Sequence, residues 1–228
     1  MTDIKIISAT RSKKEYTLLS DYWMYNCIDD CLGGITLNII ENNTESLASI
    51  YNKQIANPSN RDSILVFVHD DCVLEDIMLY SKLMMATEKF DIVGLAGIKA
   101  PITIKSPALW HLMGHPSQYS GAVAHFDKDS TNKRFMTSFG KTPERCILLD
   151  GVFLAINTKR ILEKGLRFDE KSPAKFHYYD LNFCLDANKL GLKCGTWPIW
   201  VTHKSHGLEQ PTQEWKDGER YFLTKYNS

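Results

Sequence analysis

The sequence lacks several features that would assign it to a class of proteins at once. Lys and Arg together number 27, as do Asp and Glu, so the 228-residue chain has a formal net charge of +0. A neutral chain has no long-range field that attracts polyanions, so we expect no general binding to nucleic acids. The apolar stretch 64–68 is short and the stretch 146–156 is interrupted by Asp150, so neither can span a bilayer. The N-terminus also lacks a signal-peptide pattern, and we therefore expect a cytoplasmic protein.

The cysteines are scattered along the chain and show no metal-binding spacing. The six cysteines are Cys27, Cys31, Cys72, Cys146, Cys184 and Cys194, and they include no C-x-x-C pair. A chain of this length can bury a sufficient core without disulfides. We therefore predict reduced and mostly buried thiols, as is usual inside cells.

Hydrophobic periodicity predicts alternating strands and helices in the first hundred residues. The expected strands are 3–9, 35–40, 64–68 and 91–95, and the expected helices are 12–30, a helix capped by Thr44, and 77–89. Tyr16, Leu19, Trp23 and Cys27 would form the apolar stripe of the first helix. This alternation predicts a parallel sheet with right-handed crossovers.

The second half is less regular but shows no break in composition. The expected elements are antiparallel strands within 121–139, a strand over 146–156 broken at Asp150-Gly151, a short helix capped by Asn157 or Thr158, a helix over 181–190, a strand over 193–202 and a polar tail. We predict one α/β domain with a mixed, mainly parallel sheet flanked by helices. Residues 1–100 would form a nucleotide-type half, 101–207 a mixed half and 208–228 a C-terminal tail. The substrate site is expected at the carboxyl ends of the strands.

Polar residues follow the most apolar strand directly. His69, Asp70 and Asp71 come after 64–68, and strand alternation directs His69 and Asp71 to one side and Asp70 to the other. A carboxylate at the end of a parallel strand can bind a divalent cation. The alternative is a turn in which Asp70 or Asp71 caps the next helix. We favour metal or ligand binding.

This segment resembles the acidic D-x-D-like motif that GT-A-type glycosyltransferases of the broad family 2 place after a buried strand. His69 stands in the place of the first acid and Asp71 in that of the second, with Asp70 as an alternative. The resemblance implies a GT-A-like (Rossmann-like) fold and makes Asp71 a metal ligand. It also implies that His69 and Asp70 contact the nucleotide.

Two earlier segments also resemble this family. Ser8, Thr10 and Arg11 match its first strand and loop, which hold the base and the ribose. Glu41 and Asn42 end the second strand, where the family has polar residues beside the base. The resemblance implies that all five bind the nucleotide. Strands that end in polar residues are common, so the order and spacing of the segments carry more weight than any one of them.

The second half resembles the family at three further places. Residues 149–156 resemble its acceptor-side strand and 165–170 its G-F-D-E turn. Residues 176–185 resemble its E-D-x-D-L segment, with Tyr179 in place of the glutamate. By this match Asp180 is the general base and Asp150 contacts the donor sugar or the acceptor. The structural alternatives are a helix N-cap for Asp180 and an Asp-Gly turn for Asp150.

Histidines complete the predicted site. His203 follows the last strand, where many GT-A enzymes carry a metal-binding histidine, and His206 is the alternative. The remaining histidines are expected in loops or on the surface, with the first two as possible acceptor contacts: His111, His115, His125 and His177. Arg11 and Lys204 are candidates for neutralising phosphate charge.

The resemblance covers about residues 4–207, and the His-Asp-Asp and Tyr-Tyr-Asp segments are also similar to the StrF-like subgroup of streptomycin biosynthesis. It implies Mn²⁺- or Mg²⁺-dependent, inverting transfer of a sugar from a nucleoside diphosphate donor, with UDP as the expected nucleotide, to a hydroxyl of a glycan or other acceptor. One alternative is a non-catalytic carbohydrate- or nucleotide-binding module of the same fold. The other is a nucleotidyltransferase, which the absence of glycine between Ser8 and Lys14 disfavours.

Overall fold

Strand β3 (Ile64–Val68) lies at the centre of the molecule. A computed structural model describes residues 2–19, 34–100, 110, 115–127, 130–204 and 211–226, with only the backbone of 130–132. In it, all five residues of β3 are buried, with exposures of 2% or less. The strand pairs with neighbours on both edges, which explains why its sequence is continuously apolar rather than alternating.

The sheet around β3 is mixed. Its order is β2-β1-β3-β11-β5-β12-β9. The bounds are β1 Ile4–Ala9, β2 Ile35–Ile40, β5 Ile92–Gly94, β9 Arg145–Cys146, β11 Phe153–Asn157 and β12 Cys194–Thr196. Strands β2, β1, β3, β5 and β12 run in one direction, and β11 and β9 in the other. The predicted mixed, mainly parallel sheet is therefore confirmed here.

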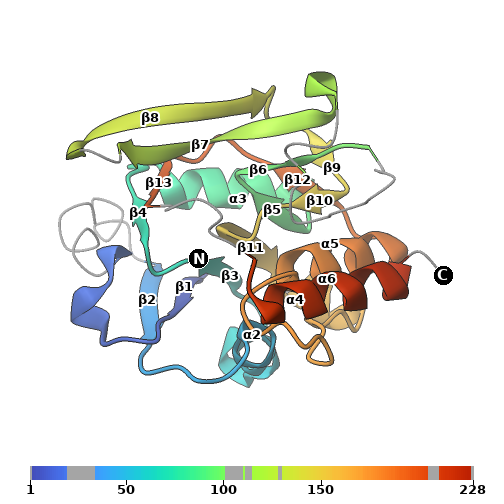
Figure 1. Ribbon diagram of the computed structural model, residues 1–228. Helices are drawn as coiled ribbons and strands as arrows, with labels where there is room; N and C mark the ends of the chain where they lie inside the picture. The colour runs from blue at the N-terminus through green and yellow to red at the C-terminus, as the bar shows by residue number, and fades with distance from the viewer. Residues whose placement is uncertain are drawn as a thin grey trace.

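A second sheet lies above the first in Figure 1. Its order is β10-β6-β7-β13-β4, and β8 pairs with β7. The bounds are β4 Cys72–Leu74, β6 Ala96–Ile98, β7 Tyr119–Asp127, β8 Ser130–Gly140, β10 Leu148–Leu149 and β13 Val201–His203. The antiparallel pair predicted within 121–139 is the β7–β8 ribbon, although the second sheet itself was not predicted.

The chain crosses between the two sheets at several places. It passes from β3 to β4, from β5 to β6, from β10 to β11 and from β12 to β13, each time within a few residues. The polar triplet 69–71 lies in the first of these crossings and Asp150-Gly151 in the third. The junction of the sheets therefore gathers segments that are far apart in the sequence.

Helices flank the sheets. They are α2 Leu47–Ala56, α3 Leu79–Lys89, α4 Thr158–Glu163, α5 Tyr179–Lys189 and α6 Gln213–Tyr226, with single 3-10 turns η1 Lys14–Tyr16, η3 Pro58–Asn60 and η5 Pro116–Gln118. Helix α3 contacts β5 and β11, and α5 contacts β10 and β12. Figure 1 shows α4, α5 and α6 together on the side away from the β7–β8 ribbon.

Three details of the helices differ from the predictions. Residues 12–17 contain only the turn η1, because Lys14 N donates to Glu41 and Thr17 is extended; Tyr16 is 74% exposed. Residues 18 and 19 are helical, as predicted, and the rest of the predicted helix, from residue 20 on, lies outside the described residues. Helix α2 is capped by Ser46, whose hydroxyl accepts from Ser49 N, and not by Thr44. The polar tail contains helix α6.

Four of the six cysteines lie among the described residues. Cys72, Cys146, Cys184 and Cys194 are buried and unpaired, as expected, while Cys27 and Cys31 fall outside the described part of the chain. Within the described ranges, no helix has both the length and the apolar character that a bilayer crossing requires.

Candidate functional site

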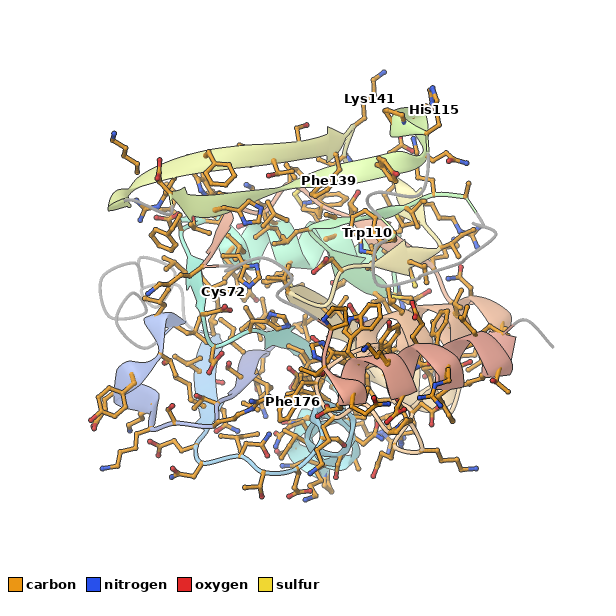
Figure 2. All side chains as sticks on the ribbon, in the orientation of Figure 1. Cys72, Trp110, His115, Phe139, Lys141 and Phe176 are labelled. Carbon is orange, nitrogen blue, oxygen red and sulfur yellow. The ribbon has the colours of Figure 1, made fainter. Side chains whose placement is uncertain are left out.

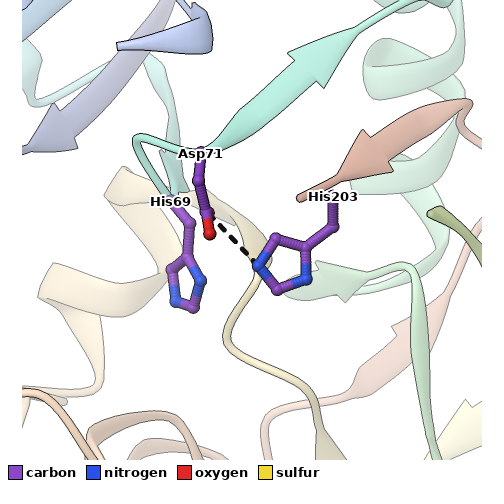
Figure 3. Close-up of side chains that lie close together, drawn as sticks. All are labelled: His69, Asp71 and His203. Carbon is purple, nitrogen blue, oxygen red and sulfur yellow. Dashed lines mark ion pairs between the residues drawn. The ribbon is translucent and has the colours of Figure 1, made fainter. Parts of the chain in front are cut away.

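Three side chains from two distant segments of the chain meet where the two sheets join. His69 and Asp71 follow β3, and His203 ends β13 (Figure 3). One ligand atom of each lies within 4.8 Å of the other two. Asp71 Oδ1 is 3.2 Å from His203 Nε2, and the rings of His69 and His203 are 5.5 Å apart. The predicted metal ligands Asp71 and His203 are thus side by side, together with His69, which was predicted to contact the nucleotide.

The electrostatics of this cluster favour an ionised Asp71. Burial alone would raise the pKa of the Asp71 carboxyl, but the hydrogen bond and the charge of His203 outweigh it, so this pKa is lowered. Burial, followed by repulsion from His203, lowers the pKa of His69. At neutral pH the site therefore offers an anionic oxygen and a neutral imidazole, which are the forms that bind metals.

A cleft of about 280 Å³ opens beside these residues. Five of the predicted site residues line it: Thr10, Arg11, His69, Asp70 and Asp71. Its apolar wall includes Tyr51 and Phe176, and the Arg11 guanidinium lies 4.0 Å from the centre of the Phe176 ring. An arginine, acids and aromatic rings around one cleft suit a ligand with both a phosphate group and a planar ring.

The other predicted nucleotide contacts do not line this cleft. Ser8 is fully buried in β1, and its Oγ has no hydrogen-bond partner among the described residues. Glu41 Oε1 accepts from Lys14 N at 2.7 Å, and Asn42, with φ 50°, donates its N–H to Ser12 O at 3.0 Å. Glu41 and Asn42 therefore hold the loop that carries Arg11, and their contact with a nucleotide stays a prediction.

The two predicted catalytic acids lie at a neighbouring crossing. Gly151 N donates to Asp180 Oδ2 at 2.7 Å, and Asp150 Oδ1 accepts from Val152 N at 3.0 Å, as in an Asp-Gly turn. Burial, followed by the charge of Asp150, raises the pKa of Asp180 to about 7. Asp150 therefore forms a turn, and Asp180 beside it can exchange a proton near neutral pH.

The structure corrects the expected setting of Asp180. Helix α5 begins at Tyr179, and its N-cap position is Tyr178, with φ 63°, so Asp180 lies in the first turn and is not the cap. A cap at the helix N-terminus would have lowered the pKa of this carboxyl, whereas burial and Asp150 raise it. The sequence could not show that Asp150 lies beside Asp180.

Three further residues of the site were not singled out from the sequence. The Tyr179 hydroxyl lies 3.0 Å from His69 Nε2 and donates to Gly151 O at 2.9 Å. A Cβ on Gly151 would lie 2.5 Å from that hydroxyl, so only glycine fits. His125 on β7 is paired in register with His203, with ring centres 6.2 Å apart, and is not the loop or surface residue expected. Strand alternation places His125 on one face but does not identify the strand beside it.

Of the remaining histidines, two lie away from this cluster and two lie outside the described residues. His115 is exposed and caps the turn η5. Figure 2 shows it well separated from Cys72, which directly follows Asp71. His177 is exposed beside Phe176, as expected for a surface residue. His111 and His206 lie outside the described residues.

Comparison with known proteins identifies the family of the chain. Residues 33–226 match the Glycosyltransferase like family. The chain belongs to this family. The match covers most of the chain, so the predicted resemblance to family-2 glycosyltransferases and the GT-A-like α/β class are confirmed. No curated protein matches the chain.

Solved structures with a similar arrangement have low sequence identity to this glycosyltransferase-like chain. A197 from STIV has 14% identity and a TM-score of 0.47, covering 93% of this chain and 99% of its own. TarS 1–349 from S. aureus has 10% identity and a TM-score of 0.48, with 89% of this chain and 60% of that one covered. The inositol-1-phosphate CTP transferase from T. maritima has 11% identity and a TM-score of 0.41, with 95% of each chain covered.

Proposed function

We propose that this protein transfers a sugar from a nucleoside diphosphate donor, with UDP as the nucleotide, to a hydroxyl group of a glycan or other acceptor. The observation that carries the proposal is the cluster of His69, Asp71 and His203 at the edge of a cleft that also contains Arg11. Membership of the Glycosyltransferase like family supports sugar transfer as the reaction. Residues 1–100 would supply most of the nucleotide site, and 101–207 the acceptor and catalytic groups.

The donor set of the cluster fits a divalent cation, Mn²⁺ or Mg²⁺. Asp71 Oδ1 is buried, and the nitrogen that faces it at 3.2 Å is His203 Nε2. A buried carboxylate oxygen is unfavourable unless its charge is compensated, and a divalent cation would compensate it. Asp71 and His203 would hold the cation. When bound, it would neutralise the charge that develops on the departing diphosphate.

Asp180 is the proposed general base. The acceptor oxygen would form a bond to the anomeric carbon while the bond from that carbon to the diphosphate oxygen breaks and its electron pair leaves with the nucleoside diphosphate. Asp180 would take the acceptor proton, and Gly151 N–H fixes the orientation of its carboxylate. A base whose pKa is about 7 suits proton transfer at neutral pH. Attack from the face opposite the leaving group gives inversion, and Asp150 would contact the donor sugar or the acceptor.

The proposal is tested by donor turnover. Purified protein with Mn²⁺ and a panel of UDP-sugars should release UDP slowly to water and faster with a suitable acceptor. Asp71→Asn should abolish the release, whereas the exposed Asp62→Asn should leave it unchanged. A protein that binds UDP but releases none from any donor would be a binding module. Release of pyrophosphate from a nucleoside triphosphate would instead indicate a nucleotidyltransferase.

A further inference from the structure

We infer that Tyr179 is a positioning residue that fixes the tautomer of His69, so that His69 becomes a third metal ligand through Nδ1. The site then has two imidazole nitrogens and one carboxylate oxygen, a set that favours Mn²⁺ over Mg²⁺. The inference rests on the proposed cation at Asp71 and His203. It assigns His69 to the metal and gives Tyr179 a role that its place in the sequence did not suggest.

The hydrogen bonds around Tyr179 allow one arrangement of protons. Its hydroxyl lies 2.9 Å from Gly151 O and 3.0 Å from His69 Nε2. A carbonyl oxygen can only accept, so the single hydroxyl proton must point to Gly151. The phenol oxygen then accepts from His69, which must carry its proton on Nε2. The opposite arrangement would leave two oxygens facing each other at 2.9 Å without a proton between them.

This tautomer leaves Nδ1 of His69 with its lone pair available. Figure 3 shows one ring nitrogen of His69 on the side of Asp71 and His203 and the other turned away from them. Since Nε2 is bonded to Tyr179, the nitrogen that faces the cluster is Nδ1. Ligating histidines are commonly fixed by a bond from their other nitrogen, and this bond sets both the tautomer and the ring orientation.

Packing holds the phenol in this place. Tyr179 is 3% exposed, and its ring lies 5.7 Å from that of Tyr51 and 6.1 Å from that of Phe168. Gly151 allows the close approach, because any side chain there would overlap the hydroxyl. The phenol therefore cannot turn away from His69 without a shift of the surrounding core.

The donor set determines which cations fit. Imidazole binds the later transition metals most strongly and Mn²⁺ less strongly, whereas Mg²⁺ prefers oxygen ligands and retains its waters, so imidazole ligands favour Mn²⁺ over Mg²⁺. The inference also connects two of the positions at which the sequence differs from the D-x-D-like and E-D-x-D-L segments. Those positions are His69 and Tyr179, and their side chains are in direct contact.

The first test reads the tautomer without any metal. Long-range ¹H–¹⁵N correlation spectra of the ¹⁵N-histidine-labelled, metal-free protein report which ring nitrogen carries the proton, and His69→Gln assigns the signal. We expect His69 with its proton on Nε2 in the wild type and a mixture of tautomers in Tyr179→Phe. Tyr221→Phe is the matched control, because it removes a hydroxyl that bonds to Asp169. A wild-type His69 protonated on Nδ1 would overturn the inference.

The second test measures binding of Mn²⁺ and Mg²⁺ alone by calorimetry. Tyr179→Phe should lose roughly 10–100-fold in Mn²⁺ affinity, the usual effect of removing a residue that orients a ligand, and much less for Mg²⁺. His69→Gln should do the same, which keeps the test valid if Tyr179→Phe folds poorly. Unchanged Mn²⁺ affinity in both variants would overturn this inference alone. Failure of the wild type to bind Mn²⁺ would instead overturn the proposed metal site.

Discussion

At the scale of single residues, the carboxyl of Asp180 is subject to opposing influences. Gly151 N–H stabilises its charged form, while burial and neighbouring Asp150 oppose that form and raise the pKa to about 7. A carboxylate with this pKa is a stronger base than an ordinary aspartate and is still ionised in about half of the molecules at neutral pH. Two predictions follow from this balance, one for the rate and one for pH.

The first prediction concerns the rate. Asp180→Asn keeps the size of the side chain and an acceptor for Gly151 N–H but removes the basic oxygen. We expect sugar transfer to fall by roughly 10²-fold or more, with UDP affinity close to that of the wild type. Initial rates and calorimetric UDP titration measure the two quantities. A normal transfer rate would leave Asp180 with a structural role, and Asp150 would be the next candidate.

The second prediction concerns pH. The pKa of Asp180 is raised in the folded protein, so the folded state binds its proton more tightly than the unfolded state does. Binding of this proton therefore stabilises the folded state. The stabilisation is fully present below about pH 4 and is lost as the pH rises through about 7. Asp180→Asn should therefore stabilise the protein at pH 8 by roughly 1–3 kcal/mol, and by less at pH 5. Denaturant unfolding at both values measures this, and an equal effect at the two pH values would contradict it.

At the scale of elements, helix α6 holds the segment that leads into α5. Lys225 pairs with Asp169 at 2.6 Å and Asp186 at 2.8 Å, and Glu214 accepts from Lys175 N at 2.7 Å. Tyr178, in the left-handed region at φ 63°, packs against Trp215 of α6, with ring centres 5.5 Å apart. This strained residue directly precedes Tyr179 and Asp180, so α6 supports the backbone that places both side chains.

The third prediction tests this support at Gly218. A Cβ there would lie 2.6 Å from Ala174 Cβ and 2.8 Å from Tyr178 Cδ2. Alanine usually stabilises a helix by about 1 kcal/mol relative to glycine, but here we expect Gly218→Ala to destabilise the protein by roughly 1–3 kcal/mol and to reduce transfer. Exposed Lys216→Ala on the same helix is the control and should change stability by less than about 0.5 kcal/mol. A stabilised Gly218→Ala protein would show that α6 does not press on Tyr178.

The elements also show what the sequence can and cannot predict. Continuous apolar runs such as 64–68 identify buried strands, and Asn157 caps α4 as expected, because both signals are local. Helix α6 was missed because its buried face is narrow, with only Trp215, Gly218 and Phe222 buried. The sequence predicted a single strand over 193–202, but the structure has two short strands there, β12 and β13, which belong to different sheets. Sequence alternation does not reveal which sheet a strand joins.

The same limit applies to the site. Asp71, His203 and Asp180 were predicted from the resemblance to family-2 glycosyltransferases together with their places near the ends of elements, and the structure brings the first two together. Tyr179 and His125 were not predicted to belong to the site, because each contacts a residue that is distant in the sequence. Tyr179 contacts His69, 110 residues away, and His125 contacts His203, 78 residues away. Such pairings follow from the crossings between the sheets.

At the scale of the whole molecule, the fourth prediction concerns the nucleotide. The cleft of about 280 Å³ is small, and the resemblance to family-2 glycosyltransferases implies UDP, so we expect uridine to fit better than guanosine. In thermal-shift assays with Mn²⁺, UDP should raise the melting temperature and GDP should not. Stabilisation by GDP alone would reverse the assignment of the base.

The most direct test of the proposed function is the dependence of UDP binding on both the cation and Asp71. Wild-type protein should bind UDP in the presence of Mn²⁺ and lose this binding with EDTA. A hundredfold excess of UDP over its Kd should stabilise the fold by about 2.7 kcal/mol. Asp71→Ala should keep the melting temperature of the unliganded protein but show no Mn²⁺-dependent stabilisation by UDP. An Asp71→Ala protein that binds UDP with the same dependence on Mn²⁺ would contradict a metal site at His69, Asp71 and His203.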